Sequence, residues 1–120
     1  MMPMWDIEFY ETADGRCPTQ EFLDSLNKSN ELPFAIRKLD RLAELGPDLR
    51  RPHADILKDH IYELRIPIKH KEFRLLYFYF FDEKIIISHG IHKYGKVPQA
   101  EIEKAKRHRE DYLLKHARRK

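Results

Sequence analysis

Apolar and polar positions in the first part of the chain follow a strand-like spacing and then a helical one. Alternation of apolar and polar residues predicts a strand over residues 4–11. Apolar residues then recur every three or four positions, which predicts helices over residues 18–26 and 33–45. Gly46 and Pro47 predict the end of the second helix. The short connection between the two helices predicts a helical hairpin.

The middle of the chain returns to a strand-like spacing. Residues 61–68 alternate, with Glu63 and Arg65 on the side opposite the apolar residues. Residues 72–81 are apolar at nearly every position, which predicts a central strand covered on both faces. A third strand is predicted over residues 84–93.

A last helix is predicted over residues 98–115, with a thin apolar stripe and a basic exterior. The element order is therefore β-α-α-β-β-β-α. This order predicts an α+β fold, in which an N-terminal strand and a helical hairpin pack on an antiparallel β-meander, followed by a C-terminal helix. A length of 120 residues fits one domain spanning residues 1–120.

The net charge of +3 is unevenly distributed along the chain. The first 49 residues contain five basic and ten acidic side chains, whereas residues 93–120 contain ten basic and four acidic ones. A basic second half favours a surface that faces a polyanion. Solvated helices explain the same pattern equally well, so charge alone leaves both interpretations open.

Cys17 is the only cysteine, so the chain cannot form an internal disulfide framework. A reducing compartment fits this composition, and residues 1–10 lack the apolar core of a signal peptide. The longest apolar run, residues 75–81, is too short to span a bilayer. We therefore expect a cytoplasmic protein without a membrane partner.

Several enzyme classes are disfavoured because their motifs are missing. The sequence has no phosphate-binding loop, no dinucleotide-binding glycine pattern and no G-x-S-x-G nucleophile motif. His89 and His92 are three residues apart, and on a strand this spacing places them on opposite faces. No H-E-x-x-H pattern is present. We expect neither a metal ion nor another cofactor.

The most informative residues for chemistry lie on the predicted meander. Arg65 and Arg74 are on adjacent strands, and His92, Lys93 and Tyr94 end the next strand. Cleavage of RNA by its own 2′-hydroxyl needs one proton removed, negative charge on the phosphate stabilised and the 5′-oxygen protonated. Arginine suits the phosphate, and histidine, lysine or tyrosine can carry the protons. We expect these side chains to converge at one rim of the sheet.

Each of these residues also has a purely structural explanation. Arg65 can pair with Glu63 or Glu72, and Arg74 can be an ordinary polar residue of a half-exposed strand. His89 is expected to pack or hydrogen-bond in the core. Tyrosines in such a strand are more often core aromatics than platforms for bases.

Several short motifs occur in an order that resembles the RelE/ParE toxin superfamily, and within it the HigB-like branch related to phage-derived toxins. The motifs are Tyr62-Glu63-Leu64-Arg65, Phe73-Arg74-Leu75-Leu76-Tyr77 and His92-Lys93-Tyr94 before Pro98. The resemblance implies a fold whose helices cover one sheet face while the other face forms a concave RNA site. It also implies metal-independent mRNA cleavage in the ribosomal A site. The implied partners are the ribosome, mRNA and an antitoxin, typically a helix-turn-helix protein, in a toxin–antitoxin hetero-oligomer.

The resemblance assigns roles to residues by position. Arg65 and Arg74 correspond to phosphate-binding arginines, and His92, Lys93 and Tyr94 to late catalytic or substrate-contacting residues. Within this set, His92 or Tyr94 is expected to transfer protons, and Lys93 to stabilise charge. Further RNA contacts are expected from Lys58, Lys69, Lys71 and Lys96.

Two other functions fit the same sequence. One is a ParE-like inhibitor of DNA gyrase, which is a binding role without nuclease chemistry. The other is a non-catalytic nucleic-acid-binding regulatory module whose last helix lies on phosphate, as the basic residues 104–109 allow. RNA cleavage on translating ribosomes would separate the nuclease from both.

Overall fold

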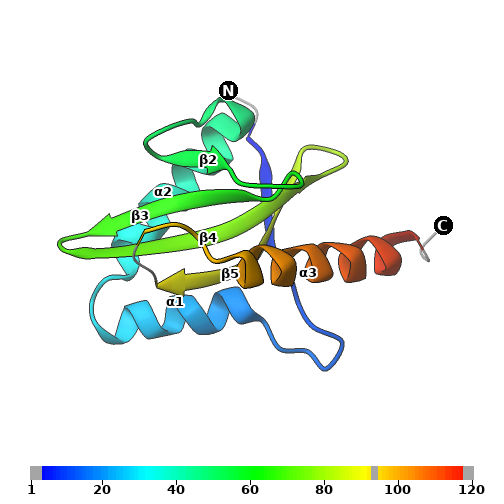
Figure 1. Cartoon of the computed structure of the whole chain (residues 1–120), viewed down its shortest axis with the longest axis horizontal. Helices are drawn as coiled ribbons and strands as arrows, with labels where there is room; N and C mark the ends of the chain where they lie inside the picture. Colours follow the sequence, from blue (N-terminus) through cyan, green and yellow to red (C-terminus); the bar gives the residue numbers. More distant parts are fainter. Residues whose placement is uncertain (1–3, 93–94, 118–120) are drawn as a thin grey trace.

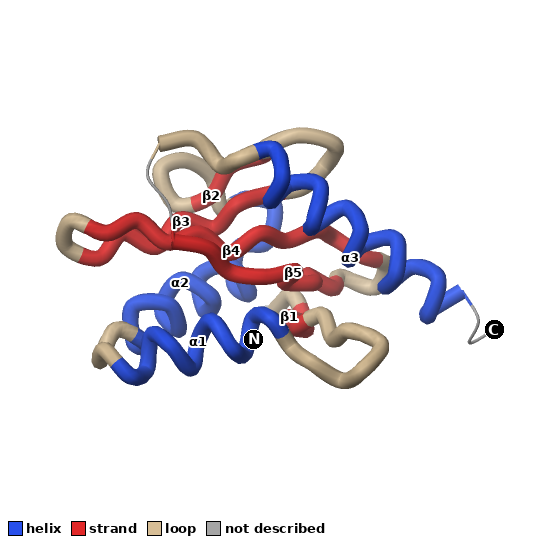
Figure 2. The backbone as a smooth tube through the Cα atoms, turned by 60° about the horizontal axis from the view of Figure 1, so that its bottom comes forward, coloured by secondary structure: helices blue, strands red, loops and turns tan. Residues whose placement is uncertain are grey.

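The computed structural model describes residues 4–92 and 95–117 and contains one five-stranded sheet with helices on both faces (Figures 1 and 2). Its elements, in chain order, are β1 (Asp6–Phe9), α1 (Pro18–Lys28), α2 (Leu32–Leu45), the 3-10 turn η1 (Gly46–Asp48), β2 (Ala54–Ile56), β3 (Tyr62–Ile68), β4 (Lys71–Phe80), β5 (Lys84–His92) and α3 (Gln99–Ala117). The strand order is β1-β5-β4-β3-β2. The α+β class and the order of the expected elements are confirmed.

The helical hairpin of α1 and α2 covers one face of the sheet. Leu23 and Leu26 of α1 and Leu39 and Leu42 of α2 are buried at the helical spacing seen in the sequence. They join a core with alternate residues of the strands, namely Leu64, Ile66, Phe73, Leu75, Ile85 and Ile87. The apolar stripes of both helices therefore pack against the same face of the meander.

The other face is not an open concave surface, which corrects the expectation from the resemblance. Helix α3 crosses it, and Ile102, Ala105 and Tyr112 are buried in a second core. This core includes Leu76 and Phe78 of β4, so the central strand is buried on both faces as its apolar run predicts. In Figure 2 α3 lies on the side of the sheet opposite α1 and α2. Beside α3, the part of this face near β2 and β3 contains an open cleft.

Two pairings at the sheet edges were not predicted. The three-residue strand β2 pairs antiparallel with β3. It was not predicted because its segment is short, polar and rich in turn-forming residues, and therefore has no clear alternation. At the opposite edge β1 pairs parallel with β5, matching Asp6 to Lys84 and Phe9 to Ile87. No helix in the described part of the chain is long and apolar enough to cross a membrane.

A bulge in β5 changes which side chains face each helical layer. The pairing with β4 shifts between Leu76 and Tyr77, so that Ser88 has no directly opposite partner. Before the bulge, Ile87 packs in the core beneath α1 and α2. After it, His89 lies opposite Leu76 on the α3 face, and Gly90 lies against Phe22 of α1. The side-chain alternation of β5 is therefore reversed at its C-terminal end.

Candidate functional site

Arg65 and Arg74 lie directly opposite each other on β3 and β4. Residues opposite each other in an antiparallel pair project from the same face. This face is the one crossed by α3, because Glu63 of β3 lies opposite Leu76 of the second core. The two guanidinium groups predicted to act together are thus on one side of the sheet.

The carboxylate of Glu63 holds both arginines in place. Nε of Arg74 donates to Oε1 of Glu63 at 2.8 Å, whereas Nε and Nη2 of Arg65 donate to Oε2 at 3.1 and 3.0 Å. Glu63 is buried, so its charge needs these partners. The structural explanation for Arg65, pairing with Glu63, is therefore also correct.

The ion pairs continue on either side of Glu63. Nη2 of Arg74 donates to Glu72 at 2.7 Å. Asp55 accepts from Nη2 of Arg65 at 3.5 Å and from Nε of Arg51 at 2.7 Å. The result is a line of alternating guanidinium and carboxylate groups across β2, β3 and β4. Such charge-assisted bonds fix side-chain positions before a ligand arrives.

A cleft of about 400 Å³ opens above this line of charges. Its walls include four of the predicted site residues, namely Lys58, Arg65, Arg74 and Lys96. Arg51 adds a fifth basic side chain, against two acidic ones in the lining, Asp55 and Glu63. The excess of cations suits an anionic ligand. We call this surface the cationic cleft.

Different parts of the fold deliver the cations of the cleft. Arg65 and Arg74 come from the paired strands, Lys58 from the turn after β2, and Lys96 from the segment before α3. The apolar side chains of Leu57, Val97 and Ile102 line the cleft and pack in or against the α3 core. Lys58 and Lys96 are exposed, whereas the adjacent Leu57 and Val97 pack against the α3 core.

The two arginines differ in how far they can reach a ligand. The Arg74 side chain is 8% exposed, whereas that of Arg65 is 29% exposed. Arg74 also donates to the carbonyl oxygen of Phe73, which occupies a further N–H group. Arg65, Lys58 and Lys96 therefore present the accessible positive charge, and Arg74 fixes the orientation of Glu63.

His92 does not join the cationic cleft, which corrects the expected convergence. It lies opposite Phe73, and its ring is 4.7 Å from the Phe73 ring on the face covered by α1 and α2. Arg74 projects from the other face. The bulge at Ser88 is the physical reason, because strict alternation from Ile86 would have placed His92 on the α3 face.

Two other predicted RNA contacts also lie outside the cleft. Lys71 follows the hairpin turn opposite Ile68 and pairs with Glu31 at 3.1 Å, on the side of the helical hairpin. Lys69 is an exposed residue of the same turn with φ of 56° and does not line the cleft. Lys93 and Tyr94 lie outside the residues that the structure describes.

Sequence reasoning missed Arg51 as a cleft residue and Glu63 as the carboxylate between two arginines. Arg51 had no signal in the sequence, because its ion pair with Asp55 forms between a turn and β2, where the helical i,i+4 rule does not apply. The alternation of β3 was the signal for Glu63, because it places this residue on the face of Arg65.

A second polar cluster connects β5 to α3. The Glu101 carboxylate can only accept a hydrogen bond, so Nε2 of His89 donates to it at 2.9 Å. Neutral His89 then accepts at Nδ1 from the Ser88 hydroxyl, which in turn accepts from Nδ1 of His108, both at 2.8 Å. Burial lowers the pKa of His89, and burial together with the nearby His89 and Lys104 lowers the pKa of His108 to about 4. This cluster confirms that His89 is hydrogen-bonded in the core.

The cluster is poorly suited to nucleophilic chemistry. Ser88 is fully buried, so no substrate can reach its hydroxyl. Among the described residues, no group of three or more histidine, cysteine and acidic side chains is placed to hold a metal ion. The cationic cleft is therefore the candidate site that best combines access with charge.

The fold and the cleft define a small α+β protein with a cationic cleft at one end of its sheet. Residues 21–110 match the family model described as Phage derived protein Gp49-like (DUF891). Because this match covers three quarters of the chain, the protein belongs to the phage-derived Gp49-like family. The family falls in the RelE-like group of toxins from toxin–antitoxin systems, whose partners are antitoxins. No curated protein matches the chain.

Proposed function

We propose that this protein is the toxin of a toxin–antitoxin pair of the HigB-like branch, and that it inhibits translation by cutting mRNA on the ribosome. The observation that carries the proposal is the cationic cleft, where Lys58, Arg65, Arg74 and Lys96 line one surface. Family membership supplies the toxin class, and the cleft supplies a place for a phosphodiester. A cognate antitoxin, of the helix-turn-helix type in this proposal, keeps the toxin inactive.

The proposed reaction is an internal transfer at one phosphodiester. The 2′-oxygen attacks phosphorus while the bond to the 5′-oxygen breaks, which leaves a 2′,3′-cyclic phosphate and a 5′-hydroxyl. Negative charge grows on the non-bridging oxygens, and Arg65, Lys58 and Lys96 are the accessible cations that face it. Because Glu63 and Asp55 already fix the Arg65 guanidinium, little reorganisation is needed.

The proposed proton carrier is the candidate that remains after Glu63 and His92 are left out, and the family resemblance supports it. Both oxygens of Glu63 already accept from guanidinium groups, so neither faces the RNA as a proton acceptor in this proposal. His92 is left out of the proposal because its ring packs on Phe73 across the sheet. Tyr94 remains our proposed proton carrier, and Lys93 remains a proposed source of charge stabilisation.

The decisive experiment adds the purified protein to translating ribosomes and maps mRNA ends by primer extension. The wild-type protein should produce new ends within the translated region, with 5′-hydroxyl termini. The variant Arg65→Ala should cut about 10²-fold more slowly, which is the effect of removing one preorganised donor to a developing oxyanion. Circular dichroism would check that its fold is retained, as expected because Glu63 keeps Arg74 as a partner.

Lys28→Ala is the matched control, because Lys28 is an exposed lysine at the end of α1 and outside the cleft. It should cut at the wild-type rate. Equal rates for Arg65→Ala and Lys28→Ala would refute the role assigned to the cleft. Absence of cutting together with inhibition of DNA gyrase in a supercoiling assay would replace the proposal with the ParE-like function. Binding to nucleic acid without either activity would indicate a regulatory module.

A further inference from the structure

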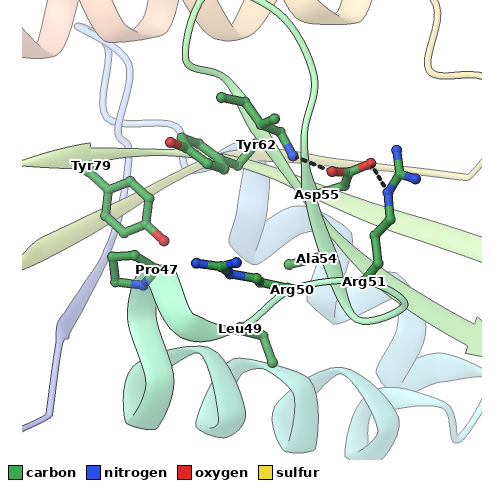
Figure 3. Close-up of a pocket in the computed structure, with 9 residues that line it drawn as sticks. Pro47, Leu49, Arg50, Arg51, Ala54, Asp55, Tyr62 and Tyr79 are labelled. Carbon is green, nitrogen blue, oxygen red and sulfur yellow. Dashed lines mark hydrogen bonds and ion pairs between the residues drawn. The ribbon is translucent and has the colours of Figure 1, made fainter.

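A cavity of about 460 Å³ lies on the other side of β2 from the cationic cleft (Figure 3). It opens at the sheet edge, on the face shared with α2 and η1. Ala54 and Ile56 point into it because they alternate with Asp55, which faces the cleft. Its remaining walls are mostly apolar or aromatic and come from Pro47, Leu49, Tyr62 and Tyr79.

Arg50 is an exposed basic side chain of this cavity, next to Arg51. Figure 3 shows its side chain extending past Ala54 toward Pro47, so that the guanidinium and the Tyr79 hydroxyl point toward one another. No hydrogen bond or ion pair joins this guanidinium to another residue in the described part of the chain. By contrast, Arg51, Arg65 and Arg74 are all bonded to carboxylates. Arg50 therefore keeps its donors available to a ligand.

Tyr79 adds a fixed hydroxyl beside Arg50. Its ring makes edge-on contacts with Trp5 at 5.4 Å and with Tyr62 at 5.0 Å between centroids. Burial raises the pKa of Tyr79 to about 12. A phenol hydroxyl can both donate and accept, so Tyr79 can bond a ligand beside Arg50.

The cavity and the cationic cleft adjoin each other at the sheet edge, where they share two lining residues. Arg51 and Asp55 line both of them, and only the three-residue strand β2 separates them. A strand occupies only about 4.8 Å across the sheet. A nucleotide whose phosphate rests on Arg65 can therefore reach the cavity with its base by crossing one edge strand.

The geometry points to this cavity as a base pocket that selects guanine next to the phosphate held in the cationic cleft. This inference rests on the proposed function. Arginine has only donors, and guanine offers two adjacent acceptors, O6 and N7, whereas adenine places a donor beside its N7. The aromatic and apolar walls suit a base that has left its stack, as in recognition of single-stranded RNA.

The test compares cleavage sites of the wild-type protein and the variant Arg50→Gln across a mixed mRNA pool on ribosomes. Wild-type cuts should favour guanine beside the broken bond by about fivefold or more, since a bidentate pair contributes about 1–3 kcal/mol of discrimination. Glutamine pairs with adenine in the bidentate manner, so Arg50→Gln should shift the preference toward adenine. Arg37→Gln, at an exposed arginine of α2, is the matched control and should keep the guanine preference.

Cleavage without a guanine preference, or with the same preference in Arg50→Gln, would overturn the base pocket and leave the proposed function standing. If no RNA is cut, the proposed function fails, and NMR titrations with 5′-GMP and 5′-AMP decide the pocket separately. Stronger shifts of Tyr62 and Arg50 resonances with 5′-GMP would support it, and equal or absent shifts would overturn it. An Arg50→Gln toxin that keeps its base preference but escapes the antitoxin would show a protein-binding surface instead.

Discussion

At the scale of single residues, the buried Arg74–Glu63 pair is the most sensitive feature of the site. Both side chains are less than one tenth exposed, and their bond is 2.8 Å long. Removing one member of such a pair leaves the other charge buried and uncompensated. Arg74 therefore serves the stability of the site as well as its charge.

Arg74→Ala should lower the free energy of unfolding by about 3–5 kcal/mol, as measured by urea denaturation. The double variant Glu63→Met with Arg74→Met should recover most of this loss, because it removes both charges and fills the same space. Arg37→Ala, on the exposed face of α2, should stay within about 0.5 kcal/mol of wild type. An Arg74→Ala variant as stable as this control would contradict the account of the buried pair.

The sequence was sufficient for some site residues and insufficient for others, for reasons visible in the strands. Simple alternation places Arg65 and the neighbouring Glu63 on one face, and pairing then brings Arg74 opposite Arg65. The position of His92 depends on the bulge at Ser88, which has no signature in the apolar pattern of β5. Arg50 was missed because its role depends on the unpredicted strand β2.

At the scale of elements, the contact between β5 and α1 depends on the absence of a side chain at Gly90. A Cβ atom there would lie 2.3 Å from Cγ of Phe22, closer than atoms can approach. Gly90→Ala should therefore destabilise the fold by about 1–3 kcal/mol, from strain in a packed core.

A double-mutant cycle checks this explanation. Phe22→Leu should make the Gly90→Ala substitution less harmful, which gives a favourable coupling energy between the two positions. Thermal denaturation of the four proteins measures it. Additive effects of the two substitutions would show that Gly90 is needed for backbone conformation and not for the close approach of Phe22.

Besides its apolar contacts, helix α3 is joined to the sheet by the polar cluster of Ser88, His89, Glu101 and His108, which makes its docking sensitive to acid. The pKa of His108 falls from 6.5 to about 4 on folding, so the unfolded chain binds more protons between these values. Stability contributed by neutral His108 is full above about pH 6.5 and is lost as the pH falls toward 4. The lowered pKa of His89 acts in the same direction.

Urea denaturation at several pH values between 7 and 4 measures this loss. His108→Asn removes one titrating ring but keeps a donor near the position of Nδ1 for Ser88. Its stability should therefore depend less steeply on pH than that of the wild-type protein. Identical pH dependence in both proteins would exclude His108 as a source of acid sensitivity.

Most elements could be predicted because their periodicity agrees with their burial. The stripes of α1 and α2 indicate the core of one sheet face, and the apolar run of β4 indicates burial on both faces. The position of α3 on the sheet could not be predicted from its thin apolar stripe. The stripe shows that Ile102, Ala105 and Tyr112 are buried, but it does not show which face of the sheet they contact. The parallel pairing of β1 depends on tertiary topology and has no local signal.

At the scale of the whole molecule, the cationic cleft brings five basic side chains together at the end of the α3 face near β2 and β3. Lys58 and Lys96 are exposed there beside Arg65, whereas Lys28 and Lys69 lie outside the cleft. Release of counterions from a nucleic acid depends on the number of phosphates that the protein neutralises. The salt dependence of RNA binding can therefore distinguish these two groups of lysines.

Replacing both Lys58 and Lys96 by alanine should reduce the slope of log affinity against log salt concentration by about 1.4 for single-stranded RNA. The matched double variant Lys28→Ala with Lys69→Ala should leave the slope unchanged. Fluorescence anisotropy with a labelled oligonucleotide over a salt series measures both. A larger change of slope in the Lys28→Ala, Lys69→Ala variant would indicate that RNA binds on the side of the helical hairpin instead.

The pairing of β1 with β5 has a consequence for biosynthesis. It joins residues 6–9 to residues 84–87, so the sheet stays incomplete until most of the polypeptide has left the exit tunnel. A nascent chain that has exposed only its helical hairpin lacks the framework that orients Arg65 and Arg74. The cationic cleft thus forms only late in synthesis, because its lining also includes Lys96, which follows β5 in the chain.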